Sequence, residues 1–152
     1  MPLTPYVENK ILSQITGQGS PLTVNQAWLG LASSEPSFSG NSVLSTYELS
    51  TTVGYSRILV GQSGTPVTYG FGTPSIGEIY NSKQLKFDMA DPDGAGWGTA
   101  THALIFDAST GGNLLAYGQL VDPSDHSTPL SLSIGAGEVA VAPVSAVHIS
   151  FN

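Results

Sequence analysis

Short runs of apolar residues recur along most of the chain, and in several of them apolar and polar residues alternate. A period of two residues is typical of a β-strand with one buried face, because successive side chains point to opposite sides of a sheet. The alternation of Leu85, Phe87 and Met89 with charged neighbours predicts that these three side chains are buried. On this evidence, strands are predicted over residues 26–33, 55–60, 85–89, 130–134 and 147–151.

The clearest pair of strands lies in the second half of the chain. Two apolar runs, Ala103–Phe106 and Leu114–Tyr117, flank the segment Asp107–Asn113, which is rich in Asp, Ser and Gly. Apolar runs on both sides of such a segment indicate a β-hairpin. Gly111 and Gly112 supply the backbone freedom, including positive φ, that a reversal of the chain requires.

A different period appears at the N-terminus. Val7, Ile11 and Ile15 are spaced by four residues, and Leu12 widens the apolar stripe that they form. This pattern predicts an amphipathic helix, with Thr4 as its cap, Pro5 in its first turn and Gly17 at its end. We expect the stripe to cover a sheet of the same chain, with packing on a neighbouring subunit as the alternative.

Turn-forming clusters separate the predicted strands at intervals of mostly 10–20 residues. Regular short strands of this kind predict an all-β fold, either a sandwich or a jelly-roll-like barrel, with the short N-terminal helix attached. We expect one domain over residues 1–152, made of a helical arm (1–17) and a β-domain (22–152). The segments Ser33–Tyr55 and Gly61–Asn81 are the least regular and are interpreted as arms or tips.

The composition narrows the possible functions. Only 10% of the 152 residues are charged, whereas a helical bundle needs charged side chains on its solvent faces. The net charge is −7 with four basic residues, so the footprint that nucleic acid requires is missing. The sequence has no cysteine, no apolar run long enough for a membrane helix and no secretory signal. We therefore expect a product that is soluble in the cytoplasm of the cell that makes it.

No catalytic or metal-binding pattern is evident. His102, His126 and His148 lack the spacing of zinc ligands, and we interpret His102 as a hydrogen-bonded residue at a strand entry. Ser63 lies in a near match to the nucleophile motif Gly-x-Ser-x-Gly. Asp91 and Asp93 could offer oxygen ligands to a cation, but Asp-Pro-Asp-Gly is also a common turn. The sequence thus predicts no enzyme, no cofactor and no metal.

The block WGTATHALIFDASTGGNLLAYGQL, from Trp97 to Leu120, resembles a family of small virion proteins of tailed phages. Two further segments, Trp28–Pro36 and Glu48–Arg57, are similar to parts of the same family and follow in the same order. The resemblance implies a structural role in a virion and no enzyme activity. It leaves open the location of the protein on the particle.

Within that family we expect a capsid decoration protein that binds the outer surface of the head and bridges capsid subunits. Its partners would be the major capsid protein and further copies of itself, as a homotrimer. The alternative is a tail-fibre or tail-tip protein. A less favoured interpretation is a carbohydrate-binding module, in which Tyr69, Phe71 and Tyr80 form an exposed aromatic platform.

The interface is expected on the apolar face of the helix and on the two irregular segments. The residues assigned to it are Val7, Ile11, Ile15, Phe38, Tyr47, Tyr69 and Phe71. The residues assigned to the core are Leu104, Phe106, Leu115, Tyr117, Val147 and Ile149.

Overall fold

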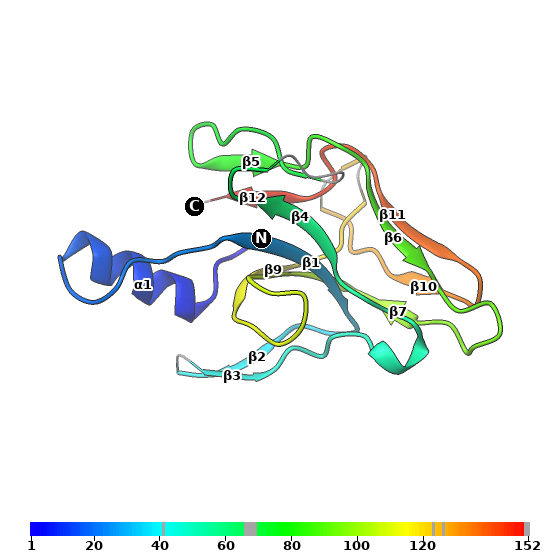
Figure 1. The fold of residues 1–152 in the computed structure, drawn as a ribbon. Helices are drawn as coiled ribbons and strands as arrows, with labels where there is room; N and C mark the ends of the chain where they lie inside the picture. Colours follow the sequence, from blue (N-terminus) through cyan, green and yellow to red (C-terminus); the bar gives the residue numbers. More distant parts are fainter. Residues whose placement is uncertain (41, 66–69, 123, 126, 151–152) are drawn as a thin grey trace.

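The computed structural model describes residues 1–40, 42–65, 70–122, 124–125 and 127–150. In this part of the chain the fold is all-β with one short N-terminal α-helix, as the sequence predicts. Figure 1 shows the strands gathered in one body, from which helix α1 projects to the left.

The centre of the fold is a four-stranded antiparallel sheet. Its strands lie in the order β4 (Ile58–Gln62), β1 (Gln26–Ala32), β8 (His102–Phe106) and β9 (Leu114–Gln119). The predicted hairpin forms its β8–β9 half. Strand β1 pairs with β8 without interruption, with Leu29 opposite Ile105.

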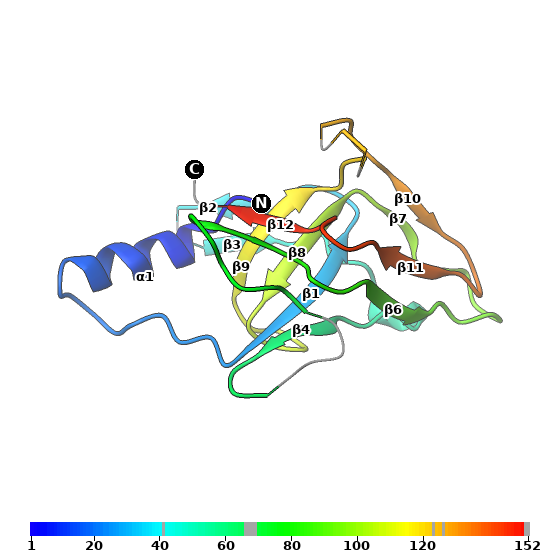
Figure 2. The ribbon, with the colours of Figure 1, turned by 90° about the horizontal axis from the view of Figure 1, so that it is seen from above.

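Pairs of short strands surround this sheet. In Figure 1 the β5–β12 pair lies above the sheet and the β2–β3 hairpin lies below it. Figure 2, seen from above, shows β9, β8, β1 and β4 side by side. A single 3₁₀ turn, Thr51–Val53, follows β3. The antiparallel pairs are β2 (Ser37–Ser39) with β3 (Ser42–Ser45), β5 (Glu78–Tyr80) with β12 (His148–Ser150), β6 (Leu85–Met89) with β11 (Val139–Ala142), and β7 (Gly98–Ala100) with β10 (Leu132–Ile134).

The central sheet is buried on both faces, because alternate residues of its strands enter different apolar clusters. Leu31 and Ile105 belong to the larger cluster, which includes Leu85, Phe87 and Trp97. The smaller cluster on the other face is formed by Ala32, Leu104, Phe106 and Leu114, with Phe38 and Tyr117 packed against it. The predicted core residues therefore lie in the core, although Tyr117 and Ile149 are only half-buried.

Helix α1 (Pro5–Ile15) is attached to the sheet only near its first turns. Val7 is buried and Ile11 is half-buried against the core, whereas Leu12 and Ile15 are 58% and 75% exposed. The expectation that the stripe covers a sheet of the same chain thus holds for its N-terminal half alone. The other half projects away from the body (Figure 1).

The prediction that Thr4 caps the helix is wrong for its side chain. No side-chain hydrogen bond caps this end of α1, and the Thr4 hydroxyl donates instead to the carbonyl oxygen of Leu114 at 2.6 Å. Since Thr4 is fully buried, satisfying its hydroxyl by a bond across to β9 fastens the start of the helix to the sheet. Gly17 ends the helix with φ +69°, as the sequence indicates.

The alternation in residues 85–89 does not hold to its end. Leu85 and Phe87 are buried, but Met89 is 55% exposed, contrary to the prediction. The register between β6 and β11 shifts between Val139 and Val141, and an extra residue in one strand re-aims the side chains beyond it. Strand β4 also begins later than predicted, so that Tyr55 and Arg57 precede it.

The segment that enters β7 passes very close to the chain after β10. Gly96 has φ +74°, and a Cβ atom at this position would lie 2.5 Å from the carbonyl oxygen of Ile134 and 2.7 Å from the carbonyl carbon of Gly135. Only glycine fits both the left-handed backbone and this close approach. Gly98, two residues later, has φ +84° but nothing within 4 Å of such an atom.

Candidate functional site

The loop between β8 and β9 is held in shape by its own residues. The Asp107 carboxylate accepts a hydrogen bond from the Asn113 backbone N–H at 2.6 Å and one from the Asn113 side-chain amide at 2.7 Å. Gly112 has φ +73°, and a Cβ atom there would lie 2.5 Å from the Asp107 carboxylate. The loop is therefore a closed, glycine-dependent turn whose tip, Ser109–Asn113, faces solvent.

Arg57 anchors this loop to the rest of the fold. Its Nη1 atom donates hydrogen bonds to the carbonyl oxygens of Ala108 at 2.7 Å and Gly111 at 2.8 Å. The guanidinium carbon lies 3.3 Å from the centre of the Phe106 ring, within the range of a cation–π contact. One side chain thus contacts both the entry and the tip of the loop.

The other side of the guanidinium faces Glu48. Arg57 donates through Nε and Nη2 to the two oxygens of the Glu48 carboxylate, each at 2.7 Å, in a bidentate ion pair. The side chains are only 7% and 18% exposed, so the pair is shielded from water. Shielding makes each partner dependent on the other, because removal of one leaves a charge without compensation.

Tyr55 links the ion pair to the central sheet. Its hydroxyl donates to Glu48 at 3.0 Å and accepts the backbone N–H of Leu31 at 2.8 Å. Burial, and then the charge of Glu48, raise the pKa of Tyr55 above its usual value, so the hydroxyl stays protonated. Gly30 makes room for it, since a Cβ there would lie 2.9 Å from both the Tyr55 hydroxyl and Glu48.

The three segments that carry the resemblance therefore meet in one network. Gly30 and Leu31 come from the first segment, Glu48 and Arg57 from the second, and the β8–β9 loop from the third. All the bonds of the network connect side chains to one another or to the backbone of this chain. The arrangement holds a surface loop in place, and it contains no nucleophile paired with a base. The sequence offered only a weak signal, two opposite charges in a chain with few charges.

His102 and His148, the histidines within the described residues, have separate surroundings. His102 lies beside the Thr101 hydroxyl, with 2.9 Å between Oγ1 and Nδ1, at the entry of β8 as expected. Burial lowers the pKa of His102, and the charge of Glu35 acts in the opposite direction. His148 stacks on Tyr80 with 4.2 Å between ring centres, and its Nε2 atom lies 3.8 Å from Glu78. His126 lies outside the described residues.

The Asp91–Gly94 segment is a turn stabilised by its own bonds. The Asp91 side chain accepts the backbone N–H of Asp93 at 3.0 Å, and the Asp91 carbonyl accepts that of Gly94 at 3.1 Å. Across the described residues, no three His, Asp or Glu side chains are grouped so that they could hold a metal ion.

The predicted interface residues have different environments. On α1, Val7 is buried in the core of its own chain, Ile11 is half-buried and Ile15 is exposed. On the irregular segments, Tyr47 is 47% exposed and has φ +49°, whereas Phe38 packs on Tyr117 with 5.4 Å between ring centres.

The aromatic platform considered for sugar binding involves three residues. Phe71 is half-buried and packs against the core, and Tyr69 lies outside the described residues. Tyr80 is 40% exposed, and its described ring partner is His148 rather than Phe71.

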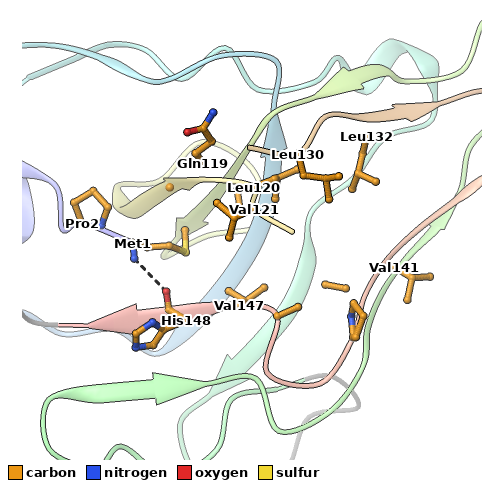
Figure 3. A pocket seen from close by; sticks show the side chains of 15 residues that line it. Met1, Pro2, Gln119, Leu120, Val121, Leu130, Leu132, Val141, Val147 and His148 are labelled. Carbon is orange, nitrogen blue, oxygen red and sulfur yellow. Dashed lines mark hydrogen bonds between the residues drawn. The ribbon is translucent and has the colours of Figure 1, made fainter. Parts of the chain in front are cut away.

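An apolar pocket that the sequence analysis missed opens between the end of β9 and strands β10, β11 and β12. Its volume is about 470 Å³. Figure 3 shows Leu120, Val121, Leu130 and Leu132 on one wall and Val141 and Val147 on the other. Met1 and His148 lie near one end of the pocket, joined by a hydrogen bond from the Met1 amino group to the His148 carbonyl oxygen at 3.1 Å. No periodic pattern could have revealed the pocket, because its walls come from separate strands.

The loop that joins Val121 to Leu130 beside the pocket is tied by Asp125. The Asp125 carboxylate accepts hydrogen bonds from the backbone N–H groups of Ser127 and Thr128, each at 2.9 Å. The Thr128 hydroxyl donates to the same carboxylate. Hydrogen bonds from Thr128, first from its side chain and then from its backbone, lower the pKa of Asp125 to about 2.

The lowered pKa of Asp125 predicts that the stability of the fold decreases in acid. Because the pKa in the folded state is below the unfolded value of about 3.9, the ionised Asp125 stabilises the fold above pH 4, and this contribution is lost as the pH falls from about 4 to about 2. Thr128→Val removes one donor, so we expect the Asp125 pKa to rise toward its usual value. Carbon-13 NMR titration of the carboxyl group measures both values; titration near 3.9 in the unchanged chain would contradict the prediction.

The comparisons with known proteins bear on this chain as a whole. A family model described as podophage GP4 fiber I protein gp80 matches residues 2–142. The chain belongs to this gp80 family. Membership makes it a phage virion structural protein, in agreement with the resemblance seen in the sequence. No curated protein matches the chain. The gp80 match favours the fibre alternative over the preferred expectation of a capsid decoration protein.

The described part of this gp80-family chain offers no helix that is both long and apolar enough to cross a membrane. The network around Arg57 is formed by the segments Trp28–Pro36, Glu48–Arg57 and Trp97–Leu120, and all three lie within the range that the family model matches.

Proposed function

We propose that the chain is a structural subunit of the podophage tail fibre that acts by self-association and performs no catalysis. The observation that carries this proposal is the match of the gp80 fibre family to residues 2–142, which is nearly the whole chain. The fibre role replaces capsid decoration as the favoured one. The proposed main partner is accordingly another copy of the chain rather than the major capsid protein.

The distribution of apolar side chains supports an assembling role. Several large apolar residues are exposed at the end of α1, on strand β3 or just after it, and in the turn before β5. Exposed apolar groups, in a chain with few charges, favour contacts with protein partners. They include Leu12, Ile15, Leu44, Tyr47 and Ile76.

Immunogold labelling of intact virions tests the location. With an antibody against this chain, we expect gold particles at the tail and a copy number of a few to a few dozen per virion. Label spread over the whole head, with hundreds of copies, would contradict the fibre role and restore the decoration role. An antibody against the major capsid protein provides the matched control for head labelling.

A further inference from the structure

One exposed residue has a conformation that its side chain disfavours. Ser75 and Glu78 exchange backbone hydrogen bonds of 2.8 and 2.9 Å, which close a two-residue turn before β5. The residues between them, Ile76 and Gly77, have φ +51° and +74°. Such a turn normally carries Asn, Asp or Gly at its first central position, and a β-branched residue with positive φ is a genuine outlier.

The side chain of Ile76 is not packed against the rest of its own chain. It is 99% exposed, the highest value among the exposed large apolar residues. The chain therefore accepts an unfavourable backbone conformation in order to present an apolar side chain at the tip of a turn. Strained residues of this kind persist where they serve a function, so the contact that compensates for Ile76 is to be sought outside the chain.

The apolar pocket supplies a matching surface. Its volume of about 470 Å³ exceeds that of an isoleucine side chain severalfold, and most of its lining residues are aliphatic. Ile76 is not among these residues, so it does not fill the pocket of its own chain, although β5, which follows it, pairs with β12, whose His148 lines the pocket. Each copy thus presents both an apolar projection at Ile76 and an apolar hollow.

The charges beside the two features are opposite. Glu78 follows the turn that carries Ile76, and its side chain is 45% exposed. Lys86, an exposed residue of β6, lies directly across from Val141, which forms part of the pocket wall. In a chain with only four basic residues, a lysine at the pocket rim favours an acidic partner surface.

We propose that Ile76 of one copy inserts into the pocket of a second copy, with Glu78 approaching Lys86 at the rim. This inference rests on the self-association in the proposed function and specifies its contact. Because the two surfaces differ, the contact is heterologous, and successive copies form a closed ring or continue as a filament.

Disulfide trapping tests the contact directly, because the chain contains no cysteine. Ile76→Cys and Val141→Cys are prepared as separate proteins, mixed and oxidised. We expect a covalent dimer that contains one chain of each variant. The matched control mixes Val141→Cys with Leu44→Cys. Leu44 is also an exposed apolar residue, but it lies on β3 and not in the turn that carries Ile76. Equal cross-linking in both mixtures, or none in the first, would overturn the proposal.

Substitutions provide the second test. Asn tolerates positive φ, so Ile76→Asn removes the projection without harming the fold, and we expect at least a tenfold weaker self-association by sedimentation with an undiminished melting temperature. Leu44→Ser, the control, should associate as the unchanged chain does. Association unaffected by Ile76→Asn would overturn the contact but leave the fibre role standing. A chain that stays monomeric at every concentration would overturn both the contact and the self-association, whereas gold labelling decides the location independently.

Discussion

Arg57→Ala is expected to lower the free energy of unfolding by about 3–5 kcal/mol, the range seen when one partner of a shielded ion pair is removed. The substitution deletes both bonds to Glu48 and both bonds to the β8–β9 loop. It also leaves the Glu48 carboxylate, only 18% exposed, without its counter-charge. Chemical denaturation followed by circular dichroism measures the loss.

Two controls separate the role of this site from a general effect of charge. Arg57→Lys keeps the charge but not the planar fork, so we expect an intermediate loss of stability. Lys86→Ala removes a positive charge from an exposed position and should change the free energy of unfolding by no more than about 0.5 kcal/mol. A loss below about 1 kcal/mol for Arg57→Ala would show that the network does not stabilise the fold.

Gly96→Ala should destabilise the chain by about 2–5 kcal/mol. A left-handed backbone conformation costs an alanine about 1–2 kcal/mol, and forcing a methyl group into a filled space adds about 1–3 kcal/mol. The neighbouring atoms at 2.5–2.8 Å belong to the backbone of Ile134 and Gly135, which cannot rotate away as a side chain could. Thermal unfolding of the purified variant measures the effect.

Gly98→Ala is the matched control, since Gly98 also has a positive φ but has no atom within 4 Å of a Cβ. We expect it to lose only the backbone part, about 1–2 kcal/mol. Equal losses for the two variants would mean that the close approach of the chain to Ile134 has no energetic weight.

The sequence predicts those elements whose burial follows a simple period. Strand β1 and the β8–β9 hairpin were found because their apolar runs are continuous and bounded by turn residues. Strands β2, β3, β5, β7 and β11 were missed, because each has only three or four residues and lacks the longer alternating stretch that revealed the equally short β10 and β12. Such strands form because the rest of the fold brings their partners to them.

The candidate sites depend still more on distant partners. Arg57 lies next to Glu48 and to the β8–β9 loop only after β1, β4 and β8 have paired. The apolar stripe of α1 was recognised, but no local pattern indicates that Val7 is buried whereas Ile15 is exposed. Ile76 gave no signal, because its significance lies in a backbone angle.

The place of β1 in the sheet has a consequence for the newly synthesised chain. β1 is completed early, yet its neighbour β8 follows only after the intervening residues 33–101 have been made. Until then its apolar strand can pair with other chains, which is the condition under which β-rich proteins aggregate during synthesis. Pairings so distant in sequence also slow folding. A newly made chain therefore completes the central sheet of its subunit only once β8 and β9 have been made.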